Sequence, residues 1–272
     1  YIVTNALDRR TKNDIHGINK GEITINGSNS SVGMGANNGI ITNDNSGKIN
    51  INGIKSAGMY GTNDSDLINN GEINVVATSA KNESIGMYID DQKSTIINTG
   101  KINVGKSSYG IFGKKVDMTS GEINVADDGV GVYSTGPSVN LAGGKINVAN
   151  NNAVGIYIDN ATVAPKPTIV KGNVDMKVGQ NSAGFLITAA NIKTDLNTKA
   201  PNDVHIGENS VYIYSRAPQG LGGKIENKSN IVTDGNNSYG IYSSQDFINR
   251  GNIDLRSGTG NVGIYSAQGV GQ

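Results

Sequence analysis

Few residues of this 272-residue chain are of the types that carry out acid–base or metal chemistry, and they lie far apart. The chain has two histidines, His16 and His205, and no cysteine. A histidine metal site or a nucleophilic triad needs its groups within a few ångströms of one another. His16 precedes the first full repeat of the sequence, and His205, between Val204 and Ile206, is expected to face outward from a late repeat. The two histidines are therefore not expected to meet, and thiolate chemistry is excluded.

The acidic pairs Asp90-Asp91 and Asp127-Asp128 are the other candidates for chemistry. Both pairs are expected in turns, where Asp is favoured because its side chain bonds the local backbone. The two turns differ in kind, so they do not form a repeated calcium ligand set, and the GGxGxD calcium repeat is absent. We therefore expect no catalytic residues, no metal and no cofactor, and a protein that is not an enzyme.

The composition excludes further classes of protein. The 23 basic and 23 acidic side chains balance, which argues against a nucleic-acid partner, since that partner requires a basic surface. No apolar run is long enough to span a membrane as a helix. The start of the chain, Tyr1 to Asp8, lacks the pattern of a signal peptide.

A short repeat organises almost the whole sequence. Gly-Glu-Ile-Asn-Val begins at Gly71 and Gly121, and Gly-Lys-Ile-Asn-Val begins at Gly100 and Gly144. Close or degenerate copies begin at Gly21, Gly47, Gly172, Asn202, Ser229 and Gly251. The mean step of about 26 residues lies within the range of stacked solenoid repeats.

Two further apolar segments follow each start. One resembles Gly155-Ile156-Tyr157, and the next resembles Ile96-Ile97-Asn98. Three short segments rich in β-branched residues, separated by Gly, Asn, Ser and Asp, are typical of one coil of a parallel β-helix. The sequence thus predicts an all-β solenoid of about ten coils with three short strands each. Residues 1–16 are expected to form an incomplete leading coil or cap, and residues 17–272 the β-helix.

Alternation along the strands predicts which side chains face the interior. In the first strands the inward residues are Ile73, Val75, Ile102, Val104, Ile123, Val125, Ile146 and Val148. In the second strand of the sixth coil, Val154, Ile156 and Ile158 should face inward, and Gly155 and Tyr157 outward.

The residue after the first glycine alternates in charge along six repeats: Glu22, Lys48, Glu72, Lys101, Glu122 and Lys145. Opposite charges on neighbouring strands favour one register, because skipping a coil would place like charges side by side. We interpret the pattern as structural and not as a site. It is expected to end at the seventh repeat, where the equivalent residue is Asn173.

Two outward rows could contact a partner. One consists of aromatic residues: Tyr60, Tyr88, Tyr133, Tyr157, Tyr214, Tyr242 and Tyr265. These rings could stack on sugars or on a partner's side chains, although stacking on one another is favoured. The other row consists of Asn50, Asn74, Asn103, Asn124 and Asn147, and it is expected to form a hydrogen-bonded ladder.

Three consecutive coils have long connections between their second and third strands, near 158–168, 187–198 and 215–224. They should leave the rod at the same corner and lie side by side. Insertions on one face of a solenoid are commonly its binding face, although neutral variation of exposed turns is the more frequent origin. The candidate partner-binding residues are Asn160, Lys166, Asn191, Lys193, Lys199, Arg216 and Gln219.

The repeated Gly-[Glu/Lys]-Ile-Asn-Val followed by Gly-[Ile/Met/Val]-Tyr, with Asn-rich turns and no cysteine, resembles the β-helical passenger region of type V autotransporters. The Lys- and Asn-rich variety is most similar to the large fusobacterial autotransporter adhesins. The resemblance covers residues 17–266. It implies a right-handed β-helix that is secreted, extracellular and displayed on the bacterial cell surface. It also implies an anchor in the outer membrane through a C-terminal barrel that this sequence does not include.

The resemblance further implies a cell-surface adhesin segment, a rigid and non-catalytic stalk with possible binding loops. Its partner would be a glycan or protein receptor on a host or bacterial cell, with no nucleic acid and no insertion of this segment into a membrane. Two alternatives stay open. One is a carbohydrate-active enzyme on the same scaffold, which would need clustered acids, bases or bound cations on one face. The other is a pure structural spacer.

Overall fold

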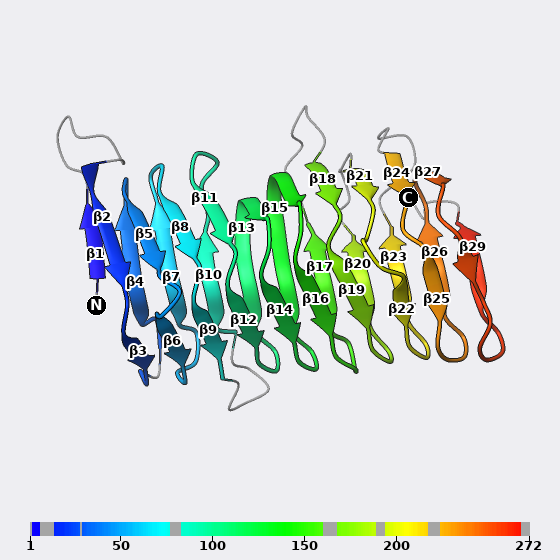
Figure 1. Ribbon diagram of the computed structural model, residues 1–272, viewed down its shortest axis with the longest axis horizontal. Coiled ribbons are helices and arrows are strands. Elements are labelled where there is room, and N and C mark those ends of the chain that lie inside the picture. Colours follow the sequence, from blue (N-terminus) through cyan, green and yellow to red (C-terminus); the bar gives the residue numbers. More distant parts are fainter. Residues whose placement is uncertain are drawn as a thin grey trace.

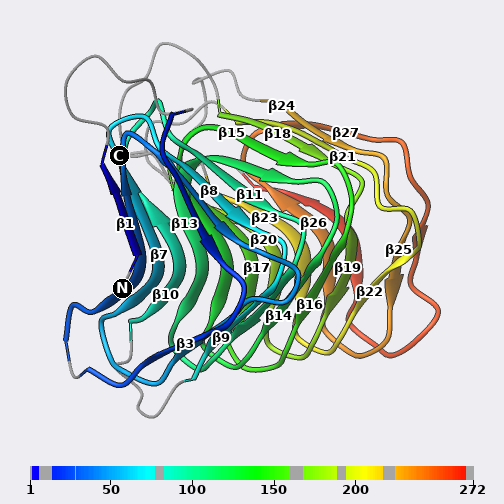
Figure 2. The ribbon, with the colours of Figure 1, turned by 60° about the vertical axis from the view of Figure 1, so that its left-hand side comes forward.

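The computed structural model describes residues 2–5, 14–27, 29–76, 83–159, 168–188, 194–216 and 224–267. These residues form a right-handed parallel β-helix, in which the chain winds into coils stacked along one long axis (Figure 1). Viewed at an angle to that axis, the outlines of the coils repeat one behind another (Figure 2). None of the described residues belongs to an α-helix. The predicted all-β solenoid is confirmed.

The coils build three faces. Face 1 is a ten-stranded sheet of β3 (Glu22–Ile25), β6 (Lys48–Ile51), β9 (Glu72–Val75), β12 (Lys101–Val104), β14 (Glu122–Val125), β16 (Lys145–Val148), β19 (Asp175–Val178), β22 (Val204–Ile206), β25 (Ile231–Thr233) and β28 (Ile253–Asp254).

Face 2 follows face 1 in each coil. It consists of β1 (Ile2–Asn5), β4 (Val32–Asn37), β7 (Ala57–Thr62), β10 (Ile85–Ile89), the first parts of β13 (Tyr109–Met118) and β15 (Val130–Leu141), β17 (Val154–Ile158), β20 (Ala183–Ile187), β23 (Val211–Ser215), β26 (Tyr239–Ser243) and β29 (Val262–Ser266).

Face 3 completes the coil. It consists of β2 (His16–Asn19), β5 (Ile40–Asn43), β8 (Asp66–Asn69), β11 (Thr95–Asn98), the last parts of β13 and β15, β18 (Thr168–Gly172), β21 (Thr194–Thr198), β24 (Lys224–Asn227) and β27 (Asp246–Asn249). Faces 2 and 3 together form one 19-stranded sheet, because β13 and β15 run through the corner between them.

Equivalent residues of successive coils align in register. Between β12 and β14, for example, Lys101 aligns with Glu122 and Asn103 with Asn124. The ten strands of face 1 correspond to the ten predicted repeats. Each strand therefore finds its backbone hydrogen-bond partners in the coil before and the coil after it.

The seventh repeat is aligned two residues away from its predicted position. Asp175, and not Asn173, pairs with Lys145. The glycine taken as the start of this repeat, Gly172, instead ends β18 and aligns with Leu141 of the preceding coil. The charge alternation thus continues for one further coil, to Asp175.

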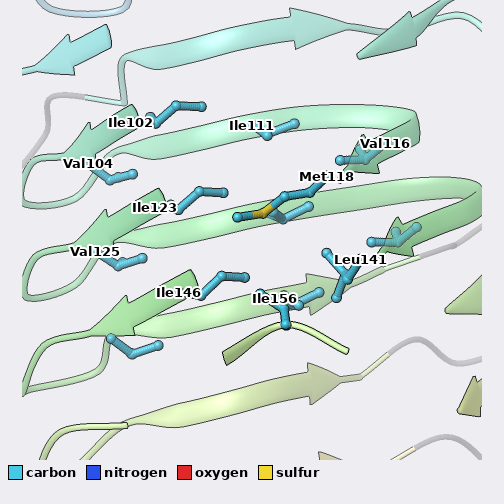
Figure 3. Packing of buried hydrophobic residues seen from close by; sticks show 14 of the residues in the cluster. Ile102, Val104, Ile111, Val116, Met118, Ile123, Val125, Leu141, Ile146 and Ile156 are labelled. Atoms are coloured by element: carbon cyan, nitrogen blue, oxygen red, sulfur yellow. The ribbon is translucent and has the colours of Figure 1, made fainter. Parts of the chain in front are cut away.

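The interior is a continuous column of mainly aliphatic side chains (Figure 3). All the residues of the first strands that were predicted to face inward are buried, with exposures of 4% or less. In Figure 3 Ile102, Ile123 and Ile146 of face 1 stack along the axis. Apolar side chains of face 3, such as Val116 and Leu141, lie on the other side of the interior. Each coil therefore covers the apolar interior of its neighbours.

Gly155 faces the interior, whereas the alternation predicted that it faces outward. Its position is buried, and a Cβ atom there would lie 3.0 Å from Cγ2 of Val148 and 2.8 Å from the carbonyl oxygen of Gly184. Gly155 and Ile156 are thus two consecutive inward positions, and Tyr157 faces outward as predicted. A glycine in a strand is typical of a point where another part of the backbone approaches closely.

In one coil a tyrosine takes the inward position that glycine occupies in the preceding coils. Tyr212 follows Gly184 in the stack, is 1% exposed and contacts the ring of Phe185 edge-to-face at a centroid distance of 5.5 Å. Its hydroxyl lies 3.3 Å from Oγ of Ser229, so the buried polar group has a partner. Burial raises the pKa of Tyr212 above its ordinary value. The tyrosine therefore stays neutral in the core.

A buried ladder of asparagines runs along the end of face 3. Its members in the first coils are Asn19, Asn43, Asn69 and Asn98. Each side-chain amide donates to the amide oxygen of the next at 2.8–2.9 Å. Met118, Leu141, Gly172 and Thr198 occupy the next four rungs, and the ladder resumes with Asn227 and Asn249 at 2.8 Å. Because these amides are buried, their mutual hydrogen bonds satisfy groups that water cannot reach.

On the outside of face 1, the predicted asparagine row is confirmed as a ladder. The amides of Asn50, Asn74, Asn103, Asn124 and Asn147 are linked one to the next at 2.7–2.9 Å. Beside it lies the charge stripe, which we define as Glu22, Lys48, Glu72, Lys101, Glu122 and Lys145.

The glutamates of the charge stripe bond to asparagines and not to lysines. Asn50 donates to Oε1 of Glu22 at 2.6 Å, and Asn147 donates to Oε1 of Glu122 at 3.0 Å. Within the described ranges no ion pair of 4 Å or less joins two members of the stripe. The alternating order of the charges favours the observed register of the face 1 strands. The ammonium groups of the stripe remain exposed to solvent.

We predict that Gly155→Ala lowers the free energy of unfolding by about 1–3 kcal/mol, because the added methyl group overpacks the interior and presses on the backbone of the next coil. Urea denaturation followed by circular dichroism measures the change. Gly21→Ala is the matched control, since no atom lies within 4 Å of a Cβ atom at Gly21. Equal losses in the two variants would contradict the close approach at Gly155.

Candidate functional site

The three long connections leave the rod at one corner. The strands that precede them end in register, because Ile158 aligns with Ile187 and Ile187 with Ser215. The strands that follow them, β18, β21 and β24, also pair in register. The connections therefore begin about 4.8 Å apart, one coil after another, at the corner between faces 2 and 3. We call this place the loop corner, defined by residues 159–167, 188–193 and 216–223.

The second of these connections is shorter than predicted. It was predicted to extend to residue 198, but β21 begins at Thr194 and pairs with β18 on one side and β24 on the other. Residues 194–198 are rich in Asn and Thr, yet they form a strand of face 3. The alternate residues Leu196 and Thr198 are buried, as in the other strands of this face.

Most of the predicted partner-binding residues lie outside the described residues. These are Asn160, Lys166, Asn191, Lys193 and Gln219. Arg216 is exposed at the loop corner, directly after β23, where its amide donates to the carbonyl of Ile187 at 2.8 Å. Lys199 is exposed too, but it follows β21 and its amide bonds the carbonyl of Gly172 at 2.7 Å. Since the whole of β21 separates it from the connection, Lys199 is not part of the loop corner.

The aromatic residues of face 2 form two stacks. Phe112 extends the first stack of tyrosines, with ring-centroid distances of 5.1 Å to Tyr88 and 4.8 Å to Tyr133. Leu186 aligns with Tyr157 and interrupts the row. The second stack consists of Tyr214, Tyr242 and Tyr265, with nearly parallel rings 4.9 and 5.0 Å apart.

In the strands of face 2, the residue that precedes the inward glycine also faces outward. Tyr109 contacts the rings of Phe112 and Tyr133 from the side, at 6.4 and 5.8 Å. Val154 was predicted to face inward, and its side chain is buried, with 9% exposed. It nevertheless aligns through Val130 with Tyr109 and is not part of the core cluster. The inward residues of the strand are therefore Gly155, Ile156 and Ile158.

Hydrogen bonds fix the rings of the sixth and neighbouring coils. The hydroxyl of Tyr133 donates to Oδ2 of Asp159 at 2.6 Å, and the hydroxyl of Thr188 donates to that of Tyr157 at 2.6 Å. Burial, together with the bonded carboxylate of Asp159, raises the pKa of Tyr133 well above its ordinary value. These rings support one another and the turns beside them, while the ends of the row, Tyr60 and Tyr265, are the more exposed, at 37% and 46%.

An open groove of about 390 Å³ lies on face 1 in the sixth to ninth coils. It is lined by Lys145, Asp175, Met176, Lys177, Asn202, Asp203, His205 and Asp234. The outer asparagine row ends at Asn147, and Lys177 and His205 continue its column. His205 faces outward as predicted, and its Nδ1 lies 2.9 Å from Oδ2 of Asp234.

The carboxylates of this groove are bound by neighbouring asparagines. Asp175 accepts hydrogen bonds from the amide nitrogen and the side chain of Asn202, at 3.1 and 2.7 Å. Asp203 accepts one from Asn230 at 3.1 Å. No serine or threonine lines the groove, so the His205–Asp234 pair has no hydroxyl nucleophile beside it. The arrangement can bind a polar ligand through charges and hydrogen bonds.

The described residues include no group of three or more histidine, aspartate or glutamate side chains placed to hold a metal ion. Among these same residues, no helix has the length and apolar character needed to cross a membrane.

The acidic pairs are turn residues, as expected. Asp127 and Asp128 accept hydrogen bonds from Asn151 and Asn152 of the next coil, at 2.9 and 3.2 Å. Asp91 accepts bonds from the amides of Lys93 and Ser94 at 2.9 and 2.8 Å and from the Ser94 hydroxyl. Partial burial raises the pKa of Asp91, but these hydrogen bonds lower it more, so that it lies below its ordinary value.

The groove on face 1 was missed by sequence reasoning. Its signal is the change from the repeated asparagine to Lys177 and His205 in the outer column of face 1. The misalignment of the seventh repeat concealed this change, because it assigned Asp175 to that column in place of Lys177. The contribution of Phe112 to the aromatic stack was missed for a simpler reason, since only tyrosines were counted.

Comparison with protein families finds that residues 35–119 are similar to the family described as the BigA third pectate lyase-like domain. The matched segment is less than half of the chain and covers part of the first coils. Neither the curated proteins nor the solved structures include a match to the chain. The family similarity and the β-helix together fit a β-helical passenger, and the likeness to fusobacterial adhesins rests on the repeat alone.

We predict that Asp91→Asn lowers the free energy of unfolding at pH 7 by about 1 kcal/mol, because an amide accepts fewer hydrogen bonds from the turn. The pKa of Asp91 is depressed from 3.8, so its carboxylate stabilises the fold above that value and the stabilisation is lost as the pH falls through the lower folded pKa. Urea denaturation at pH 7 and pH 3 should show the difference between variant and wild type shrinking in acid.

Asp90→Asn is the matched control for this prediction. Asp90 pairs with Lys114 at 3.1 Å on the surface, so the change should cost less than about 0.5 kcal/mol. A loss at Asp91 that is the same at both pH values would show that its charge is not the cause.

Proposed function

We propose that this chain is a non-catalytic segment of a surface-displayed bacterial adhesin. In this proposal the β-helix is an extracellular stalk, as in the passengers of type V autotransporters, and the loop corner contacts a glycan or protein receptor on a host or bacterial cell. The observation that carries the proposal is the in-register departure of three successive long connections from one corner of the rod.

The regularity of the rod supports the role of a stalk. Ladders of backbone hydrogen bonds, asparagine ladders over several coils and an apolar interior hold each coil to the next. A rod of this kind carries whatever it displays at a fixed place and orientation. Loops presented by a rigid scaffold are a common location of binding residues.

The loop corner has the composition of a contact surface. The three connections contain lysine, arginine, asparagine, threonine and proline, and two of the three contain proline. Proline limits the conformations of a loop and thereby reduces the entropy lost on binding. Arg216, at the described edge of the corner, offers an exposed guanidinium group for hydrogen bonds to a polar receptor.

A carbohydrate-active enzyme is the second candidate, and the groove on face 1 favours it. The groove combines carboxylates, lysines and the His205–Asp234 pair, and the matching family is described as pectate lyase-like. Incubation with a panel of polysaccharides, followed by measurement of reducing ends and of unsaturated products, separates the two candidates. Turnover that is lost in His205→Ala would replace the adhesin proposal with the enzyme.

We predict that trimming the loop corner abolishes binding. In the test, residues 160–167, 189–193 and 217–223 are each replaced by a short Gly-Ser linker, and the protein is applied to a glycan array and to cultured host and bacterial cells. Binding by the intact chain should fall at least tenfold in the trimmed protein, because the contact residues are removed while the coils are kept. Circular dichroism verifies that the β-helix is retained.

The matched control replaces residues 77–82, which connect face 1 to face 2 at a different corner. This control should bind as the intact chain does. Full binding after trimming of the loop corner would overturn the proposal, and no binding by the intact chain to any target would favour a pure spacer.

A further inference from the structure

Face 1 presents a surface whose charges match those of a second copy of the same chain. We propose that two copies associate through face 1 with their long axes antiparallel. The contact is formed by the charge stripe and by the outer asparagine ladder beside it. The contact does not involve the loop corner, which lies between faces 2 and 3. The proposed dimer can therefore be tested independently of the proposed function.

The lysines of the charge stripe have no partner within the described part of their own chain. Lys48, Lys101 and Lys145 are exposed, and no ion pair or hydrogen bond to their ammonium groups is present there. Elsewhere on the surface, Lys106 and Lys114 do pair with aspartates of neighbouring coils, at 3.4 and 3.1 Å. The ammonium groups of the stripe are thus available to a carboxylate from outside the chain.

The glutamates of the stripe are oriented by their own chain, but over the described ranges only one oxygen of each carboxylate accepts a side-chain hydrogen bond. Glu22, Glu72 and Glu122 each accept a side-chain hydrogen bond from an asparagine at Oε1. The other oxygen of each carboxylate has no such bond among the described residues. Each glutamate is therefore oriented by its own chain and can still accept a hydrogen bond from a lysine of another molecule.

The order of the charges selects one arrangement of two copies. The six members of the stripe alternate in sign, so reversing one copy end to end over these six coils places every negative charge opposite a positive one. The next charge, Asp175, then lies beyond Glu22 of the other copy, and both of its carboxylate oxygens are already bonded by Asn202. The facing pairs are Glu22 with Lys145, Lys48 with Glu122, and Glu72 with Lys101, and each pair occurs twice about a two-fold axis. A parallel two-fold pair would instead place each charge opposite its own copy. Of these two symmetric arrangements, only the antiparallel one is complementary at each of the six rungs.

The rest of face 1 is compatible with close approach. In these coils the only other outward column contains asparagine, apart from Thr24. An amide both donates and accepts hydrogen bonds, so an asparagine column can face a reversed copy of itself. No aromatic or long apolar side chain projects from these strands.

The dimensions of the surface indicate that a single contact is weak and that stable association requires many contacts at once. Six rungs of four-residue strands cover roughly 24 by 13 Å, or roughly 300 Å², against about 800 Å² per partner in a standard stable interface. A single pair should dissociate readily and should be sensitive to salt, because exposed charges are screened. An array of rods on one surface would meet an array on another through many such contacts at once.

The first experiment tests the charges by complementation. The full chain is attached to beads in one orientation, and the aggregated fraction of beads is measured in about 50 mM and about 0.5 M salt. Wild-type beads should aggregate at low salt and disperse at high salt. Two triple variants are compared: Lys48→Glu, Lys101→Glu and Lys145→Glu in one, and Glu22→Lys, Glu72→Lys and Glu122→Lys in the other.

For each triple variant alone, the aggregated fraction of beads at low salt should be at least tenfold lower than for the wild type, because like charges then face one another. An equal mixture of the two kinds of bead should regain the wild-type level. Circular dichroism verifies that both variants keep the β-helix. Self-aggregation by either folded variant, or failure of the mixture to aggregate, would overturn the proposal.

The second experiment tests the orientation with single substitutions that leave the stripe largely intact. The chain contains no cysteine, so Lys48→Cys and Glu122→Cys each introduce one thiol. With a short bismaleimide reagent, the mixture of these two proteins should give at least five times more cross-linked dimer than Lys48→Cys alone. The control pairs Glu122→Cys with Lys171→Cys, which is exposed on face 3. A yield from the mixture no higher than this control, or a greater yield from Lys48→Cys alone, would overturn the antiparallel contact.

Discussion

Each strand of this protein finds its hydrogen-bond partners one coil away, and this constraint decides the form of the sequence. A residue at a given point of the coil lies about 4.8 Å from the equivalent residue of the next coil, so it must tolerate a copy of itself or a complement as its neighbour. Isoleucine and valine meet this condition inside, where they fill the column that each coil shares with the next. Asparagine meets it in both environments, because its amide donates to one neighbour and accepts from the other. Charged residues meet it only if their signs alternate, as they do from Glu22 to Asp175.

The places where the columns change are therefore informative about function. The buried asparagines give way to Met118 and Leu141, the aromatic row is interrupted by Leu186, and the outer asparagines end before Lys177. The last two changes, together with the three long connections, lie in coils that follow one another in the second half of the rod. The first coils, by contrast, repeat with little variation on face 1. The molecule thus joins a uniform part, whose surface is repetitive, to a part in which face 1 and the loop corner both depart from the repeat.

The repeat of the sequence was sufficient to predict the parallel β-helix, its coils, the inward aliphatic columns and the outward rows. The errors have identifiable causes. The seventh coil was misaligned by two residues because Val174, Met176 and Val178 alternate regularly, and a shift of two leaves every side chain on its own face. Gly155 was placed outside because alternation assumes an even strand, whereas the backbone here turns two consecutive residues inward.

The candidate site was less accessible to prediction than the fold. The common corner of the long connections followed from the coil, and the aligned strand ends confirm it. The place of Lys199 could not be derived, because Thr- and Asn-rich residues 194–198 have the composition of a loop and are held as a strand only by the neighbouring coils. The groove at His205 brings together residues of four coils, and such a combination depends on the exact alignment that the sequence left ambiguous.

The direction of the backbone hydrogen bonds has a mechanical consequence. In all three faces these bonds run along the axis of the rod, so a pull on its two ends loads them one coil after another instead of all together. The coil with the weakest hold should open first and release about 26 residues, or roughly 90 Å of extended chain, before the next coil takes the load. A rod built in this way would lengthen in steps under tension, and it would limit the force that reaches whatever is attached at its far end.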